Sequence, residues 1–365
     1  MGFKCGLVGL PNVGKSTLFT ALSNLPVERA KYPFSTIEPN KGVIPVRDER
    51  LYKVAVLAGI EKITPATLTI VDIAGLIKGA GRGEGLGNRF LAHIREMDLL
   101  LHVIRGFKAT DVPHLTGEPD PQRDIEIINI ELILADLAFL EKRREKALRN
   151  VKSNSPEAHL EKNLVEKIYV HLNNGKPVRT LSLPAEEKAI AEGWELLTMK
   201  PELFVVNLDE NELSEKEPET VRSISKIAEE TQTPVIGICA SLEEELAEMA
   251  DDERKAFMEE YGLPETGLDR LIKLGYDYLS LITFFTIKGK EARAWAVERG
   301  VSARKAAGKI HSDMERGFIA AEVIGWEELL KAASLAAAKE KGIVRLEGRD
   351  YTIKDGEVIL FRFKV

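Results

Sequence analysis

The stretch Gly9–Ser16, with the sequence GLPNVGKS, limits what this chain can fold into more than any other. It satisfies the pattern G-x-x-x-x-G-K-[ST] and stands between a short apolar run, residues 3–8, and the helix-like run TLFTALSNL. Glycines let such a loop curl so that successive N–H groups point at phosphate oxygens, and the helix that follows adds positive potential at its first turn. The sequence therefore predicts a strand, a phosphate-binding loop and a helix.

The loop and two later motifs supply candidate ligands for a triphosphate and its metal. We expect Lys15 to reach the β- and γ-phosphates and the Ser16 hydroxyl to bind Mg²⁺. Asp72 ends a strand in TIVDIAGL, a D-x-x-G pattern, where its carboxylate is expected to hold Mg²⁺ through water and Gly75 to offer its N–H to the γ-phosphate. Thr36, in YPFSTIEPN, is either the residue that closes over the metal or a plain loop threonine. The predicted catalytic group is Lys15, Thr36 and Gly75, and the predicted metal group is Ser16, Thr36 and Asp72.

Strand signals recur along the first two thirds of the chain, at residues 42–46, 67–71, 99–104, 203–206 and 235–238. Helical segments lie between most of them. Such alternation predicts an α/β fold with a mostly parallel sheet and helices on both faces.

Two long helical patterns interrupt this alternation and predict an inserted arm, residues 124–200. Each helix is expected to span about 20 residues, with the two antiparallel. The apolar stripes that predict them are Ile130, Ile133, Leu134, Leu137 and Leu140 in the first helix, and Leu160, Leu164, Ile168 and Leu172 in the second. Lysines and arginines at residues 142–152 could contact RNA, but an ordinary solvated face is the favoured interpretation.

Residues 283–365 change character and predict a compact α+β module after a first unit of residues 1–282. The segments YTI and VILFRF, joined through Asp355-Gly356, predict a β-hairpin. Between Lys288 and Arg316 there are eight Lys or Arg and four acids. This excess of positive charge is compatible with a surface for RNA phosphates and with an ordinary solvated surface. The resemblance given below, rather than the charge count, favours the RNA surface. Trp295 and Phe318 are expected in the core.

Composition excludes several classes of function. A formal charge of -7 argues against a nonspecific nucleic-acid binder, so no DNA partner is indicated. No apolar run approaches the length of a membrane span, which predicts no membrane partner. The two cysteines, Cys5 and Cys239, stand in apolar strand-like runs and are expected to be small buried thiols, which fits a cytoplasmic location.

Four motifs together carry a family resemblance. VGLPNVGKST, YPFSTIEPN, DIAGLIKGAGRGEGLGNRFL and NLDE resemble the Obg-like ATPases of the YchF type, in the translation-factor class of P-loop proteins. The stretch from FFTIKGKEARAW to GFIAAEVI resembles the TGS module, a ubiquitin-like β-grasp domain. The resemblance covers essentially the whole chain. It implies a P-loop G domain with an inserted helical arm and a C-terminal TGS domain, binding of ATP and ADP with ATP preferred over GTP, and association with the ribosome through the large subunit or rRNA.

The segment NLDE, residues 207–210, bears on the choice of base. Guanine-binding proteins use N-K-x-D there, and the Asp accepts two charge-assisted hydrogen bonds from guanine. Glu210 is one methylene longer, the Asn207 amide oxygen could accept from the adenine N6 group, and Leu208 would leave an apolar contact for the purine. Residues Cys239–Ser241 (CAS) also lack the lysine of the usual S-A-K loop. ATP is therefore favoured, and GTP stays open because a longer acid can bend back. Asn12, Val13, Gly14 and Thr17 complete the expected nucleotide-binding set with Lys15 and Ser16.

A water-orienting group is not obvious. Leu76 stands where many switch GTPases carry a Gln, so unaided hydrolysis is expected to be slow. Three candidates remain open: His114, a residue of a partner, or K⁺ held near Asn12. His93 and His102 are expected to be packing residues.

The leading hypothesis is a slow Mg²⁺-dependent ATPase switch that acts at the ribosome. A GTPase of the same fold is one alternative. A nucleotide-sensing binding protein whose hydrolysis is incidental is the other.

Overall fold

The structure is a computed structural model and describes residues 2–24, 41–73, 85–109, 114, 119–150, 155–213 and 218–364. Two six-stranded sheets organise these residues, in the orders β2-β4-β1-β5-β6-β7 and β11-β10-β12-β8-β9-β3. The predicted residues Thr36, Gly75 and Leu76 lie outside the described part of the chain.

The first sheet confirms the predicted strands to within one or two residues at each end. It is parallel except for β2, which runs antiparallel to β4. Its strands are β1 (Phe3–Val8), β2 (Lys41–Pro45), β4 (Thr67–Asp72), β5 (Leu99–Arg105), β6 (Glu202–Asn207) and β7 (Val235–Ile238). Because parallel strands end at the same edge of a sheet, the residues that follow β1, β5 and β6 lie close together.

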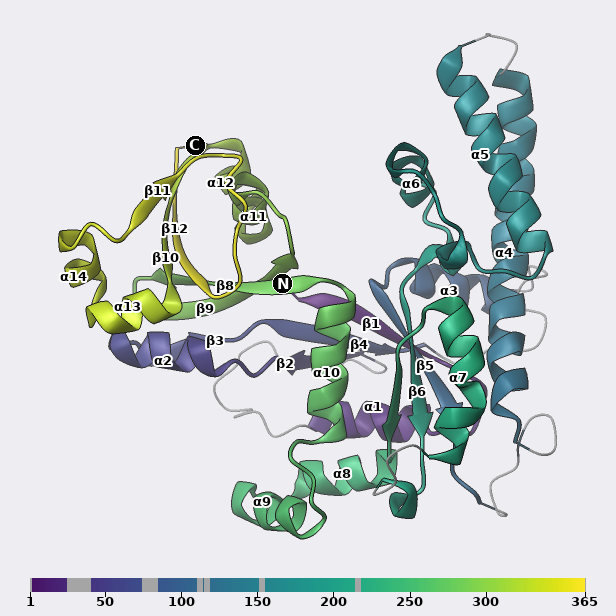
Figure 1. Cartoon of the computed structure of the whole chain (residues 1–365), viewed down its shortest axis with the longest axis horizontal. Coiled ribbons are helices and arrows are strands. Elements are labelled where there is room, and N and C mark those ends of the chain that lie inside the picture. Colours follow the sequence, from purple (N-terminus) through teal and green to yellow (C-terminus); the bar gives the residue numbers. More distant parts are fainter. Residues whose placement is uncertain are drawn as a thin grey trace.

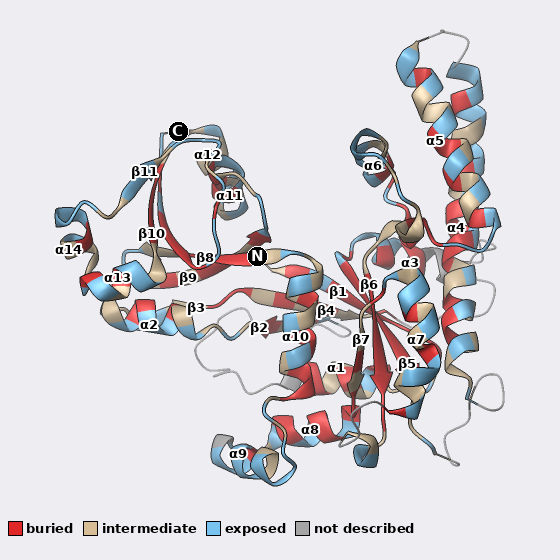
Figure 2. Cartoon of the chain, in the orientation of Figure 1, coloured by how far each residue is buried: buried red, intermediate tan, exposed pale blue. Residues whose placement is uncertain are grey.

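Helices cover both faces of this sheet, as the alternation predicts. Helices α1 and α10 lie on one side, and α4 and α7 on the other (Figure 1). Buried residues concentrate on the strands between them (Figure 2). The helices of this unit are α1 (Lys15–Asn24), α3 (Gly85–Arg95), α4 (Pro121–Asn150), α7 (Glu219–Thr231), α8 (Ala240–Glu248), α9 (Asp251–Glu260) and α10 (Gly267–Tyr278).

Helix α4 and helix α5 (Pro156–Asn173) lie side by side and project from the sheet (Figure 1). Helix α4 has 30 residues, not about 20, and α5 has 18. The expected stripe on α4 is partly wrong: Ile133 and Leu140 are buried, whereas Ile130 and Leu134 are 52% and 43% exposed. The stripe on α5 is confirmed at Leu164, Ile168 and Leu172, which are buried. Arg143 and Arg144 at the basic end of α4 pair with acids of α5.

The chain returns from α5 to β6 through short elements that pack on α4 and α5. These are η3 (Val178–Thr180), α6 (Ala185–Glu192) and η4 (Leu197–Met199). The buried Asp136 carboxylate of α4 accepts hydrogen bonds from the backbone N–H groups of Leu197 and Thr198 at 2.9 and 2.8 Å. The arm is thereby fixed to the strand that leads to Asn207.

The second sheet takes one strand from the N-terminal half of the chain. Strand β3 (Lys62–Thr64) pairs in parallel with β9 (Glu291–Glu298), so the sequence boundary at residue 282 does not separate the two sheets cleanly. The other strands are β8 (Leu281–Lys288), β10 (Phe318–Gly325), β11 (Arg345–Glu347) and β12 (Glu357–Phe363). Helix α11 (Ala303–Ile310) packs on one face, with α12 (Ser312–Arg316) beside it. The other face is covered by α2 (Glu49–Leu57), α13 (Trp326–Ala332) and α14 (Leu335–Glu340).

The predicted hairpin of YTI and VILFRF is wrong. Strand β12 instead pairs antiparallel with β10 and in parallel with β8, and Thr352 makes only an isolated bridge to Ser302. The Asp355 carboxylate accepts a hydrogen bond from the Thr283 N–H at 2.8 Å, which anchors the turn on β8. The expected core positions Trp295 and Phe318 are confirmed, at 6% and 3% exposure.

Candidate functional site

The loop after β1 has the backbone that a phosphate-binding loop requires. Gly9, Asn12 and Gly14 have φ angles of 147°, 63° and 94°. A Cβ atom on Gly9 would lie 2.4 Å from the Val103 carbonyl oxygen, and one on Gly14 would lie 2.1 Å from the Asn207 Nδ2. Side chains at these two glycines would therefore push β5 and β6 away from the loop.

Lys15, the first residue of α1, lies in the centre of this loop. Its Nζ donates to the carbonyl oxygens of Leu10 at 2.6 Å and Gly9 at 3.1 Å, and the residue is only 9% exposed. Burial lowers the pKa of Lys15, while the nearby Asp72 carboxylate raises it. The ammonium group is held where the curled loop would present it to phosphate oxygens.

Asp72 at the end of β4 faces the start of α1. Burial raises its pKa, and the Lys15 ammonium and a hydrogen bond from the Ser16 hydroxyl lower it. Its buried Oδ1 has no hydrogen-bond partner among the described residues. A hydroxyl and a carboxylate with an unsatisfied oxygen are hard oxygen ligands of the kind that Mg²⁺ takes, so the residues present fit this ion.

Asn207 at the end of β6 joins three segments. Its Nδ2 donates to the carbonyl oxygen of Val13 at 3.1 Å, and its Oδ1 accepts from the Ala240 N–H at 2.9 Å. The side chain is 8% exposed. The phosphate loop, the NLDE segment and the CAS segment are therefore held together by one amide. Its oxygen keeps a second lone pair for the predicted contact with the base.

The structure corrects the role expected for Leu208. Its side chain is 3% exposed and lies in a core cluster with Ile104, Phe204 and Ile224, and a Cβ on Gly237 would lie 2.6 Å from it. Burial there is favourable because the side chain leaves water on every side. Only the Leu208 backbone is left for a ligand, so the expected apolar contact with the purine is wrong.

Glu210 is exposed and begins the 3₁₀ turn η5 (Glu210–Glu212). The preceding residue, Asp209, makes a contact that the motif does not predict, because the x position of N-K-x-D carries no base-recognition role. Its Oδ2 accepts from the Lys108 N–H at 2.9 Å. The signal that could have found it is an acid directly before a short turn, a position where carboxylates satisfy free N–H groups.

The histidine predictions have mixed outcomes. His102 is buried in β5 and its Nδ1 lies 2.8 Å from Glu202 Oε1, which confirms a packing role. His93 on α3 is exposed, so the packing role expected for it is wrong. The His114 side chain is buried, with Nε2 2.9 Å from Asp124 Oδ2 of α4. Cys5 and Cys239 are confirmed as buried free thiols.

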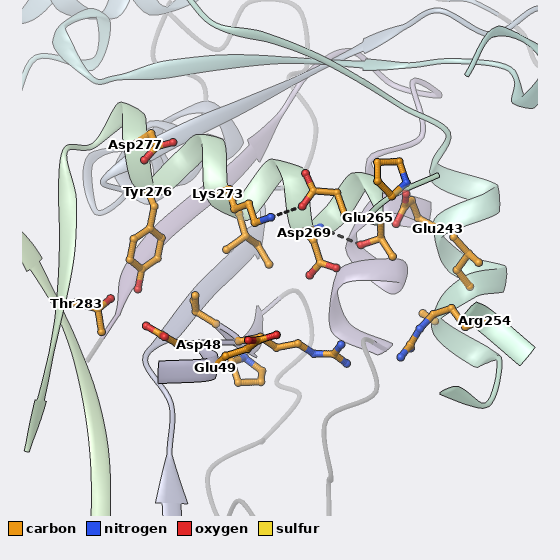
Figure 3. Close-up of a pocket in the computed structure, with 18 of the residues that line it drawn as sticks. Asp48, Glu49, Glu243, Arg254, Glu265, Asp269, Lys273, Tyr276, Asp277 and Thr283 are labelled. Carbon is orange, nitrogen blue, oxygen red and sulfur yellow. Dashed lines mark hydrogen bonds and ion pairs between the residues drawn. The ribbon is translucent and has the colours of Figure 1, made fainter. Parts of the chain in front are cut away.

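A cavity of about 720 Å³ lies away from the phosphate loop, between α8, α10 and the start of α2 (Figure 3). Glu243 of α8 lines it and accepts hydrogen bonds from the Gly267 and Leu268 N–H groups, at 2.6 and 3.3 Å. Burial raises the pKa of Glu243 to about 7. Two ion pairs, Lys273 with Glu265 and Arg50 with Asp48, also line the cavity. None of its lining residues belongs to the phosphate loop.

Comparison with known proteins agrees with this geometry. The chain is 46% identical over 365 residues to the "Ribosome-binding ATPase YchF" of Haemophilus ducreyi and 44% identical over 366 residues to that of Bacillus subtilis, with 100% of each chain covered in both cases. The chain belongs to the YchF family. A solved Schizosaccharomyces pombe "YchF GTPase" is 32% identical and superposes with a TM-score of 0.87 over 99% of this chain and 98% of the other.

Two family models match separate parts of the sequence. One, described as "50S ribosome-binding GTPase", matches residues 4–135, and one described as "Protein of unknown function (DUF933)", a YchF C-terminal model, matches residues 281–364. The YchF-family fold, with its P-loop NTPase domain, is therefore the fold of this chain. The TGS assignment and the domain boundaries given above stay predictions. Among the described residues, no helix combines the length and the apolar character of a membrane span.

Proposed function

We propose that this YchF-family protein is a slow Mg²⁺-dependent ATPase that acts as a switch at the ribosome. The observation that carries the proposal is the pair of hydrogen bonds made by the Asn207 side chain, which holds the phosphate loop, the NLDE segment and the CAS segment together. Bacterial relatives that align with the whole chain are named ribosome-binding ATPases.

In this proposal, the predicted site residues divide the binding of the nucleotide and its metal among them. Lys15 would neutralise phosphate charge from the centre of the loop, and the backbone N–H groups of Asn12–Thr17 would cradle the phosphates. Ser16 and Asp72 would hold Mg²⁺, which would neutralise charge on the β- and γ-phosphates. Asn207 would fix the base between the NLDE and CAS segments. Thr36 and Gly75 remain the proposed partners of the γ-phosphate, and K⁺ near Asn12 remains a proposed activator.

His114 is a weaker candidate for orienting the attacking water. Its Nε2 is engaged with Asp124 and its side chain is buried, whereas a group that aligns water needs a nitrogen or oxygen free to do so. A residue of the ribosome or a bound K⁺ therefore fits the proposal better.

The choice of ATP over GTP follows from the NLDE and CAS segments. Glu210 has one methylene more than the acid that grips guanine, and CAS has no lysine. The names of the relatives differ on this point, because the S. pombe protein is called a GTPase and the bacterial proteins are called ATPases. A GTPase of the same fold is therefore the second candidate.

Calorimetric titration of the full chain with ADP and GDP in the presence of Mg²⁺ separates these candidates. We expect ADP to bind at least about tenfold more tightly, which corresponds to the loss of roughly one charge-assisted hydrogen bond to guanine. Tighter binding of GDP would overturn the ATPase assignment. Lys15→Ala is expected to weaken both nucleotides, and Lys4→Ala, at the other end of β1, is the matched control.

Turnover measured with and without ribosomes tests the switch. The relatives' names indicate a ribosomal partner, and the excess of basic residues between Lys288 and Arg316 offers a surface for rRNA. We expect ribosomes to stimulate hydrolysis or to trap the ATP-bound protein. If ribosomes change neither turnover nor nucleotide release, a nucleotide-sensing protein with incidental hydrolysis is the better description.

A further inference from the structure

A tight turn that follows β5, residues 105–109, lies directly against the NLDE segment. The N–H groups of Gly106 and Phe107 both donate to the carbonyl oxygen of Asn207, at 2.8 and 3.0 Å. A Cβ on Gly106 would lie 2.9 Å from that same oxygen. Only glycine lets the turn come this close to the Asn207 carbonyl oxygen, so the contact depends on the residue type at position 106.

The buried Arg105 gives this turn its shape. Its guanidinium donates to the carbonyl oxygens of Ala109 at 2.8 Å and Phe107 at 3.3 Å, and it lies 4.5 Å from the centre of the Phe107 ring. The residue is only 2% exposed. A planar guanidinium that bonds two carbonyls of the same turn leaves the turn little freedom.

Asp209 attaches the NLDE segment to the turn at residues 105–109. Its Oδ2 accepts from the Lys108 N–H at 2.9 Å, and its own N–H donates to the Glu212 carboxylate at 3.2 Å. The turn η5 then begins at Glu210. The carboxylate of Asp209 is thus bonded to the turn at residues 105–109, and Glu210 follows Asp209 directly in the chain.

We propose that Asp209 is a specificity-determining positioning residue, which fixes Glu210 relative to the base by fastening the NLDE segment to the turn at residues 105–109. The proposal deepens the function given above and rests on it. Discrimination between two bases requires donors and acceptors that stay in place when the wrong base is offered. If the NLDE segment is no longer bonded to the turn at residues 105–109, the longer Glu210 side chain can adapt to adenine and guanine alike.

The test compares base preference in three full-length variants. Asp209→Ala removes the acceptor of the Lys108 N–H, whereas Asp209→Asn keeps an oxygen that can accept it and removes only the charge. Asp252→Ala, on the exposed surface of α9, is the matched control for loss of an acid. The Kd of ADP and of GDP is measured for each by calorimetry, and displacement by tripolyphosphate reports the phosphate loop alone.

We expect Asp209→Ala to lower the ratio of the GDP and ADP dissociation constants by about fivefold or more, the effect of one lost hydrogen bond. Tripolyphosphate affinity is expected to stay unchanged, and Asp209→Asn and Asp252→Ala to keep the wild-type ratio. An unchanged ratio in Asp209→Ala, or an equal loss of affinity for both nucleotides, overturns this inference alone. A wild-type protein that binds both bases equally overturns it together with the proposed ATP preference.

Discussion

The Nδ2 of Asn207 donates to the Val13 carbonyl oxygen at 3.1 Å, so the end of β6 and the phosphate loop are one unit. Asn207→Ala leaves this oxygen and the Ala240 N–H without their partner. Because both groups are buried, we expect a loss of about 1–3 kcal/mol in the free energy of unfolding and at least about tenfold weaker ADP binding. Urea denaturation and calorimetry measure the two effects.

The matched comparison for this variant is Asn173→Ala on α5, where an exposed Asn also donates to a backbone carbonyl, that of Tyr169 at 2.9 Å. Its loss is expected to change stability by less than about 0.5 kcal/mol because water replaces the bond. Equal costs at the two sites would show that the tie at Asn207 has no special role.

Substitution of Asp72 is expected to increase stability and to weaken metal binding. Its pKa is raised, chiefly by burial, so the site disfavours the charged form when no ion is bound. Asp72→Asn is therefore expected to raise the free energy of unfolding without nucleotide by up to about 1 kcal/mol at pH 7. The same change removes a negatively charged metal ligand, so the Mg²⁺ concentration needed for half-maximal nucleotide binding is expected to rise by about tenfold or more. Denaturation without nucleotide and a Mg²⁺ titration test the two halves separately. A variant that is less stable and equally responsive to Mg²⁺ would contradict the placement of the ion.

The sequence predicts the phosphate loop well because its physics is local. The glycines at residues 9 and 14 and the following Lys15 define a curled backbone and a helix start within a few residues. The parallel strands are predicted equally well, since runs buried on both faces are mainly apolar, as in β5.

What the sequence does not reveal depends on contacts between distant segments. The pairing of β3 with β9 joins residues more than 200 positions apart, and no local pattern at residues 62–64 predicts it. The exposed Ile130 and the buried Ile133 lie in one apolar run, and periodicity alone cannot say which side of a long helix meets the sheet. Leu208 is a further example. Its position in the motif predicts contact with the ligand, whereas its packing against distant segments places it in the core.

Arg50 joins the start of α2 to the turn before β12. Its guanidinium pairs with Asp48 beside it at 2.8 Å and with Asp355, in the turn before β12, at 2.5 Å. We expect Arg50→Leu to lower the free energy of unfolding by about 1–2 kcal/mol, since the largely buried Asp48 carboxylate and the exposed Asp355 carboxylate both lose their partner. Lys53→Leu is the control on the same helix, because its contact with Glu49 is exposed and 3.8 Å long, and it is expected to cost less than about 0.5 kcal/mol. Denaturation of both variants decides; equal costs would show that Arg50 contributes no more than a surface charge.

Glu243 predicts a pH dependence of stability. Burial raises its pKa from 4.5 to about 7, and its carboxylate accepts from the first N–H groups of α10. A group with a raised pKa binds more protons in the folded state, so its contribution to stability is complete below pH 4.5 and is lost as the pH rises through about 7. Glu243→Gln has no such loss. We therefore expect the variant to gain about 1–3 kcal/mol on the wild type between pH 5 and pH 8 in urea denaturation. Glu245→Gln, exposed on the same helix, is expected to show no such gain, and a Glu243→Gln curve parallel to wild type would rule out titration of Glu243 in this range.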